Sequence, residues 1–120
     1  MKKAYYLKSC STCQRILKEL DIFFDILQNI KEDKITPSQL DEMKNLAGSY
    51  EALFSRVAMK YKSLGLKEKT LSENDYKNYI LEEYTFLKRP VFIIDDKIFI
   101  GNSKKNITQL KEAIATEKQS

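Results

Sequence analysis

The residues most able to do chemistry are two cysteines in a single Cys-x-x-Cys motif, Cys10 and Cys13. A short β-prone run, residues 4–7, precedes the motif, and a helix is expected to begin at Ser11. Backbone N–H groups and the dipole at a helix start stabilise an anion, which lowers the pKa of a thiol placed there. The pattern therefore predicts a nucleophilic thiolate on Cys10. Cys13, one helical turn later, is predicted to resolve adducts of Cys10 by forming a reversible disulfide with it.

The alternative interpretation of the motif is two buried cysteines that behave as small apolar residues. The placement of the motif between a strand and a helix favours redox chemistry, and so does the expected cytoplasmic location. Residues 1–7 resemble a signal peptide only in their two lysines, and no apolar run is long enough to cross a bilayer. We therefore expect a cytoplasmic protein with no membrane partner.

The residue types that are absent narrow the choice of chemistry. The sequence has no histidine, which excludes Cys-His and Ser-His-Asp catalysis. Two cysteines without an imidazole make a metal site unexpected, and three glycines are too few for a glycine-rich phosphate loop. We expect no bound cofactor.

The charge of the chain fits a small anionic substrate better than nucleic acid. There are 21 basic and 17 acidic residues, a net charge of +4, and the two signs are interspersed along the sequence. Nucleic-acid binding would favour basic residues clustered on one face with aromatic residues among them, so none is expected. A mild positive balance still favours an anionic substrate.

The elements that must position the cysteines follow from hydrophobic periodicity and capping signals. Strands are predicted at residues 4–7, 22–27, 91–94 and 97–100. Helices are predicted at residues 11–20, from 37 to a stop at Gly48, from Ser72 with Leu87 on its apolar face, and after Ser103. Short helices around a loop are expected at residues 50–67. This order predicts an α/β, thioredoxin-like fold, a four-stranded mixed sheet in a single domain, 1–120, with a helical insert of about 36–86 between strands 2 and 3.

Arg89 and Pro90 come directly before the apolar run of residues 91–94. Proline cannot donate to a β-ladder, so it fits the first position of a strand, and X-Pro is the bond that can be cis. In thioredoxin-like folds a cis-proline faces the catalytic cysteine. We therefore expect a cis Arg89–Pro90 bond, with both residues near Cys10; the alternative is an ordinary proline at a strand start.

Several short segments, in order and over nearly the whole chain, resemble the glutaredoxin-dependent arsenate reductase family, which also holds the Spx transcription regulators. The segments are Cys10–Arg15, Leu53–Arg56, Tyr61–Leu66, Lys88–Val91 and Ile98–Gly101.

The resemblance implies a role for each matching residue. Cys10 matches the catalytic cysteine, Arg56 matches an arginine that contacts the oxyanion, and Arg89 matches the arginine before the cis-proline, here Pro90. Arg15 is a further candidate for substrate binding. Guanidinium groups suit a tetrahedral oxyanion because they offer several fixed donors, although each arginine could instead form a surface ion pair.

Three functions remain open from the sequence. The first is a thiol-dependent reductase related to arsenate reductase, in which Cys10 attacks arsenate or a protein disulfide and glutathione, glutaredoxin or thioredoxin supplies the reducing thiol. The second is an Spx-like regulator that docks on RNA polymerase and switches with a Cys10–Cys13 disulfide, because a second cysteine at this place is typical of the Spx branch. The third is a reductase-like protein with an unknown partner.

Overall fold

The computed structural model describes residues 1–118, and the chain divides into two compact units. The first unit consists of residues 1–33 together with the chain from Arg89 onward, and the second consists of residues 34–88. The helical insert expected at about 36–86 falls within the second unit. Both cysteines, Arg89 and Pro90 belong to the first unit, so the candidate thiol site lies within that unit.

The first unit is a mixed four-stranded sheet with helices, as the sequence predicts. Its elements are β1 (Lys2–Tyr6), α1 (Ser11–Leu20), β2 (Ile26–Asn29), β3 (Val91–Ile94), β4 (Lys97–Ile100) and α5 (Lys104–Lys118). The strand order is β2-β1-β3-β4. β1 pairs parallel with β2 and antiparallel with β3, and β3 pairs antiparallel with β4. The carboxyl end of β1, the start of β3 and the end of β4 therefore meet at one edge.

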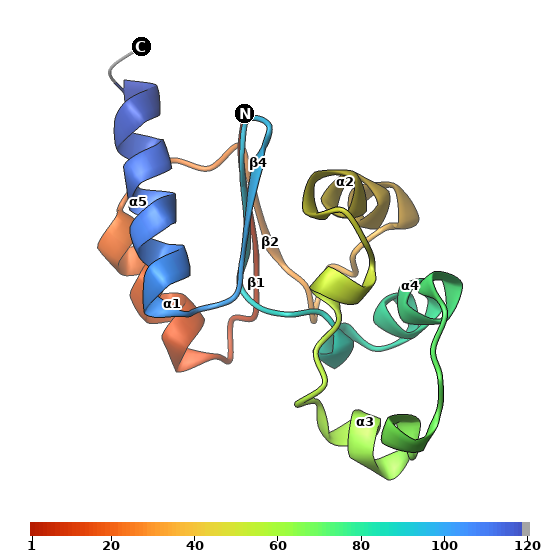
Figure 1. The fold of residues 1–120 in the computed structure, drawn as a ribbon. Helices are drawn as coiled ribbons and strands as arrows, with labels where there is room; N and C mark the ends of the chain where they lie inside the picture. Colours follow the sequence, from red (N-terminus) through yellow and green to blue (C-terminus); the bar gives the residue numbers. More distant parts are fainter. Residues whose placement is uncertain (119–120) are drawn as a thin grey trace. The chain divides into compact units, whose positions relative to one another are not determined.

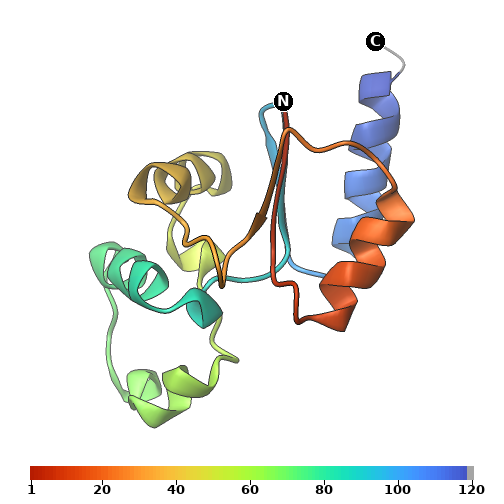
Figure 2. The ribbon, with the colours of Figure 1, turned by 180° about the vertical axis from the view of Figure 1, so that it is seen from behind.

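Helices α1 and α5 lie side by side on one face of this sheet (Figures 1 and 2). Their apolar stripes close a core with the strands, because residues three and four apart share a helix face. The core residues are Ala4, Ile16, Phe24, Phe92, Ile94, Phe99, Ile107, Leu110 and Ile114. At the start of α5, the Ser103 hydroxyl accepts a hydrogen bond from the Asn106 N–H at 3.1 Å, as expected of a cap. Two packed helices thus fix the direction in which α1 presents its first turn.

The second unit is made of short helices joined by tight connections (Figure 1). They are α2 (Pro37–Ala47), η1 (Glu51–Leu53), α3 (Met59–Ser63), η2 (Leu66–Glu68), α4 (Glu73–Glu82) and η3 (Tyr84–Phe86). The predicted start and stop signals of α2 are confirmed. Thr36 forms a capping box with Gln39, Pro37 is the first helical residue, and Gly48 ends the helix with a φ of 99°.

Aromatic rings form the centre of the second unit. Phe54 stacks on Phe86 with ring centroids 5.0 Å apart and contacts Tyr76 at 4.9 Å. The backbone on either side is fixed by two hydrogen bonds, from the Ser55 N–H to the Phe86 carbonyl at 2.7 Å and from the Lys88 N–H to the Leu53 carbonyl at 2.9 Å. The segment that leads into Arg56 is therefore rigidly held within this unit.

Three predicted boundaries are wrong. The first strand is Lys2–Tyr6, and the second is Ile26–Asn29 instead of residues 22–27. Parallel pairing with β1 sets this register, since Lys3 lies opposite Ile26, and the residues before β2 pack their apolar side chains from a loop. The helix that begins at Ser72 ends at Glu82, so Leu87 is buried from a segment beyond it.

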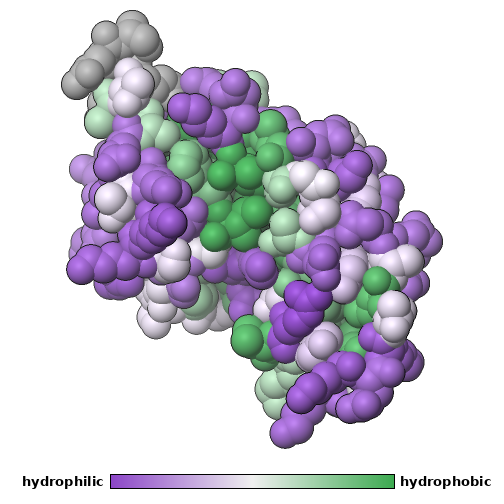
Figure 3. Space-filling view, in the orientation of Figure 1, coloured by the Kyte–Doolittle hydropathy of each residue, from purple (hydrophilic) through white to green (hydrophobic). Residues whose placement is uncertain are grey.

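Figure 3 shows one face of the molecule, where hydrophilic residues dominate and hydrophobic surface lies between them. The large apolar side chains most exposed among the described residues are Met1, Phe23, Leu27, Val57, Met59 and Leu64.

Within residues 1–118, none of the helices has both the length and the apolar character needed to cross a membrane. The same residues contain no cluster of three or more acidic, cysteine or histidine side chains placed to bind a metal ion.

Candidate functional site

The loop between β1 and α1 is held by two side chains that form hydrogen bonds with the backbone of Lys8. The Lys8 N–H donates to Asn29 Oδ1 at 3.1 Å, and the Lys8 carbonyl accepts from Gln14 Nε2 at 2.8 Å. The Cys10 N–H donates to the Leu7 carbonyl at 3.0 Å, which closes a turn just before the helix. Cys10 is thereby fixed as the residue that precedes the first helical turn of α1.

Cys10 is half-buried, and its thiol is free in this structure. Partial burial raises the pKa of this thiol, but stabilisation of the thiolate outweighs it and the net pKa is lowered. The thiolate is stabilised by the backbone N–H and the thiol of Cys13, by the Thr12 N–H and by the charge of Arg89. A helix start that offers such donors to a sulfur anion makes Cys10 the more readily ionised thiol of the pair.

Cys13 has the opposite character. Its side chain is buried, with 1% exposed, and it is also a free thiol. Burial, together with the hydrogen bond to Cys10 and the negative charge there, raises its pKa to about 11. At neutral pH Cys13 therefore stays a thiol and donates to the Cys10 sulfur. The two sulfurs are close enough to interact directly, which leaves the predicted disulfide between them geometrically open.

Arg89 and Pro90 lie at the same edge of the sheet as the cysteines. The Arg89–Pro90 bond is cis, as predicted, and Pro90 is buried directly before β3. The Arg89 charge lowers the pKa of both thiols, so the guanidinium lies near them. The Gly101 N–H donates to the Pro90 carbonyl at 2.8 Å, and Gly101 has a φ of 90°. A side chain at position 101 would be strained, which accounts for glycine beside the proline.

Arg15 pairs with a residue of its own helix. Its Nη1 donates to Glu19 Oε1 at 3.1 Å, one turn further along α1, and its side chain is 62% exposed. It lines a hollow of about 410 Å³ between α1 and α5, together with residues that include Asn102, Lys104 and Thr108. Arg15 therefore lies on the face of α1 that adjoins α5, and its role in substrate binding stays a prediction.

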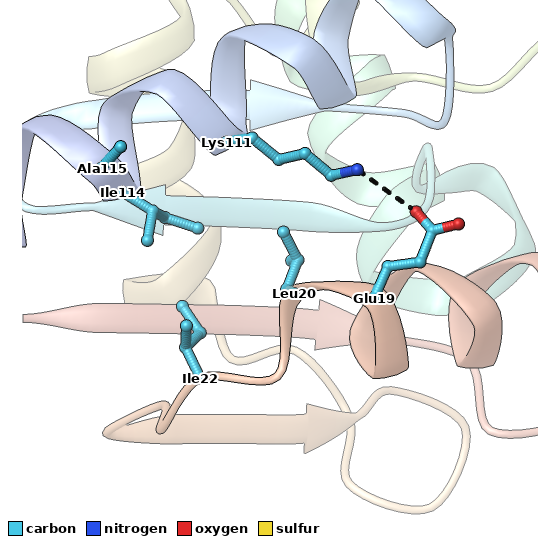
Figure 4. Close-up of a pocket in the computed structure, with 6 residues that line it drawn as sticks. All are labelled: Glu19, Leu20, Ile22, Lys111, Ile114 and Ala115. Atoms are coloured by element: carbon cyan, nitrogen blue, oxygen red, sulfur yellow. Dashed lines mark hydrogen bonds and ion pairs between the residues drawn. The ribbon is translucent and has the colours of Figure 1, made fainter.

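A neighbouring pocket of about 210 Å³ lies on the same helical face (Figure 4). Its polar side is the ion pair between Lys111 Nζ and Glu19 Oε2 at 3.5 Å. The other side is apolar and is formed by Leu20, Ile22, Ile114 and Ala115. Neither cysteine lines this pocket, so it is separate from the thiol site.

Arg56 belongs to the second unit, where it sits over two aromatic rings. Its guanidinium lies 5.7 Å from the ring centre of Tyr76 and 6.0 Å from that of Phe54. Nη2 donates to Glu51 Oε2 at 2.8 Å and to the Tyr76 hydroxyl at 3.0 Å. Desolvation lowers the pKa of Arg56, but the bonds to Glu51 and Tyr76 outweigh it and raise the pKa. Arg56 is therefore a fixed cation, held within its own unit.

Sequence reasoning missed the residues that hold these groups in place. Asn29 and Gln14 position the cysteine loop, and Glu51 and Tyr76 bind Arg56. Asn29 lies 21 residues from its partner Lys8, and Tyr76 lies 20 residues from Arg56, so no local pattern links them. The one available signal was Gln14, which directly follows the Cys-x-x-Cys motif and is spaced to reach back over the first turn.

The hydrogen bond from Cys13 predicts how the reactivity of Cys10 depends on pH. The rate of Cys10 alkylation by iodoacetamide should rise through a midpoint below the value of about 8.5 for free cysteine. Cys13→Ala should move this midpoint upward because the donor is lost, and Cys13→Ser should hold it close to wild type because a hydroxyl also donates. A wild-type midpoint at or above that of free cysteine would contradict the assignment, as would equal midpoints for the two variants.

Comparison with protein families gives one result that spans most of the chain. The model of the ArsC family matches residues 5–110. Among curated proteins there is no significant match.

Solved structures share the fold. An arsenate reductase from Vibrio cholerae superposes with a TM-score of 0.75 at 17% identity, covering 93% of this chain and 96% of that one. A possible arsenate reductase from Streptococcus mutans gives 0.69 at 26% identity, covering 92% and 97%. An arsenate reductase (ArsC) related protein from Brucella melitensis gives 0.68 at 20% identity, covering 90% and 92%. These likenesses span both units of the chain.

Proposed function

Because the chain belongs to the ArsC family, we propose that it is a thiol-dependent reductase in which the Cys10 thiolate attacks arsenate. The observation that carries the proposal is the lowered pKa of Cys10 at the start of α1, beside Arg89. A disulfide of another protein is the second substrate class that such a thiolate can attack. The proposal places the protein in the cytoplasm, where thiols are kept reduced.

The first step forms a bond between the Cys10 sulfur and arsenic(V). One oxygen of arsenate leaves as water after it takes up protons, so the arsenic stays at the same oxidation level. In the second step another thiol attacks the Cys10 sulfur and an S–S bond forms. The sulfur–arsenic bond breaks with its electron pair remaining on arsenic, which leaves as arsenite. Two thiols are oxidised to one disulfide, and arsenic gains two electrons.

The second thiol comes from glutathione or glutaredoxin, with thioredoxin as the further candidate, or from Cys13. An external thiol is favoured because Cys13 is buried and has a pKa of about 11, so it is rarely a thiolate at neutral pH. Cys13 remains able to attack once the adduct forms, since its sulfur already contacts that of Cys10. In that route the product is a Cys10–Cys13 disulfide, which the external thiol then reduces.

The arginines supply the charge that an oxyanion requires. Arg89 is near the cysteines, and Arg56 presents a rigid guanidinium from the second unit. A guanidinium can offer charge-assisted hydrogen bonds to an oxyanion, so Arg89 and Arg56 are each candidates within their own unit, and Arg15 is a third candidate from α1.

Trapping the adduct tests which thiol acts. In Cys13→Ser, intact-mass spectrometry and peptide mapping should find one glutathione on Cys10, formed only when arsenate and glutathione are both present. In wild type the same mixture should give less of this adduct if Cys13 resolves it. Absence of glutathione from Cys10 in Cys13→Ser, or an adduct that forms without arsenate, would contradict the proposed sequence of steps.

The direct contact between the two thiols also favours a second function, an Spx-like switch that senses redox state through a Cys10–Cys13 disulfide. In this case the oxidised chain, but not the reduced chain or Cys13→Ser, should bind the RNA polymerase α-subunit in a pull-down. Steady arsenite production without polymerase binding would exclude the switch as the main role.

A further inference from the structure

Arg56, Glu51 and Tyr76 form a closed triangle of hydrogen bonds. Arg56 Nη2 donates to Glu51 Oε2 at 2.8 Å and to the Tyr76 hydroxyl at 3.0 Å. The Tyr76 hydroxyl donates in turn to the same Glu51 oxygen at 3.1 Å. The side chains of Arg56 and Glu51 are 46% and 55% exposed, so a small solute can reach them.

Glu51 and Tyr76 come from two helices of this unit, and Arg56 lies in the turn that follows η1. Glu51 begins η1, where its N–H and that of Tyr50 both donate to the carboxylate of Glu73, at 3.1 and 2.7 Å. Tyr76 lies in the first turn of α4, behind the capping box of Ser72. Because Glu73 is the first residue of α4, these bonds tie η1 to α4, and the fold of this unit therefore brings Glu51 and Tyr76 together.

The triangle uses Arg56 Nη2, the nitrogen that takes part in both ways a guanidinium can bind an oxyanion with two hydrogen bonds. A guanidinium binds an oxyanion through two parallel N–H bonds, either from Nε with Nη2 or from Nη1 with Nη2. Nη2 belongs to both pairs, and it already donates to Glu51 and Tyr76. An oxyanion that is to accept two parallel bonds from Arg56 therefore competes with the triangle.

We propose that Glu51 is an internal competitor for the anion-binding edge of Arg56, so that an oxyanion must displace its carboxylate to be held by two bonds. The carboxylate also neutralises the charge of Arg56 and repels an incoming dianion. Glu51 thus lowers the affinity of Arg56 for small tetrahedral oxyanions. The inference rests on the proposed role of Arg56 in substrate binding and adds the residue that regulates it.

This inference is tested by measuring anion binding to a variant that lacks the proposed nucleophile and so cannot reduce arsenate. Full-length Cys10→Ser protein is titrated with arsenate and separately with sulfate, which no thiol reduces here, by isothermal calorimetry. Adding Glu51→Gln should tighten both anions about tenfold, which corresponds to about 1.4 kcal/mol. The matched control is Glu82→Gln, which removes the same charge from an exposed position of α4 in the same unit. It should change affinity less than about twofold, as expected of a screened surface charge.

A gain of affinity cannot come from damage to the fold, so the direction of the change is the decisive result. Adding Arg56→Ala to Glu51→Gln should remove the gain. The proposal would be overturned if the Glu51→Gln protein bound the anions no more tightly than the Glu82→Gln control. It would also be overturned if the gain survived Arg56→Ala or if no variant bound either anion. If the wild-type protein produced no arsenite but Glu51→Gln still tightened anion binding, only the proposed reductase function would be contradicted.

Discussion

Cys10→Ser is expected to abolish arsenate reduction, with a loss of at least about 1000-fold in turnover, because a serine hydroxyl is not ionised at neutral pH and is a far weaker nucleophile. The same variant should lose rapid alkylation, since the remaining thiol, Cys13, is buried and has a pKa of about 11. Arsenite formation and iodoacetamide labelling of the purified protein measure the two effects.

The control for this prediction is Cys13→Ser, which keeps a hydrogen-bond donor beside Cys10. It should retain rapid labelling of Cys10 and, with an external thiol present, a substantial fraction of turnover. If Cys13→Ser were as inactive as Cys10→Ser, Cys13 would be required for resolution. If Cys10→Ser retained turnover, the nucleophile would have been assigned to the wrong residue.

Arg89→Gln is expected to have the second largest effect, a loss of about 10- to 100-fold in kcat/KM for arsenate. Two effects of this substitution both lower kcat/KM. The charge that lowers the pKa of Cys10 disappears, so the alkylation midpoint should rise. A charge-assisted hydrogen bond to the oxyanion is also lost, and such bonds are worth about 1.5–3 kcal/mol.

Arg89→Lys separates these two consequences. Lysine keeps the charge, so the alkylation midpoint should stay near that of wild type. Because lysine lacks the planar pair of donors, the KM for arsenate should stay above that of wild type. An unchanged alkylation midpoint in Arg89→Gln would contradict the electrostatic role of this arginine, whatever the turnover.

The elements around the cysteines could be predicted from the sequence because their signals are local. Cys10 at a helix start, the capping of α2 by Thr36 and the proline before β3 are each read from a few adjacent residues. The second strand could not be placed correctly. Its apolar residues begin at Ile22, but hydrogen bonding to β1 begins only near Asp25, whose N–H donates to the Lys2 carbonyl at 2.7 Å.

Sequence reasoning names candidates for the residues that could react but misses the residues that hold them in place. A cysteine or an arginine carries its chemistry in its own side chain, so the sequence names it as a candidate. Glu51 is one of many acidic residues, and only the fold brings it to Arg56 beside Tyr76. Arg15, a candidate for substrate binding from the sequence, forms an i,i+4 pair with Glu19 that depends only on local spacing along the helix.

The central claim is that this chain reduces arsenate through the Cys10 thiolate, and arsenite formation by the purified wild-type protein tests it most directly. Arsenate is supplied with glutathione and glutaredoxin, and in a parallel reaction with thioredoxin, and arsenite is separated and quantified over time. The account predicts steady production over many turnovers with at least one of these reductants, and none with Cys10→Ser under the same conditions. Arsenite at the level of the protein-free reaction with every reductant, or equal production by Cys10→Ser, would contradict it.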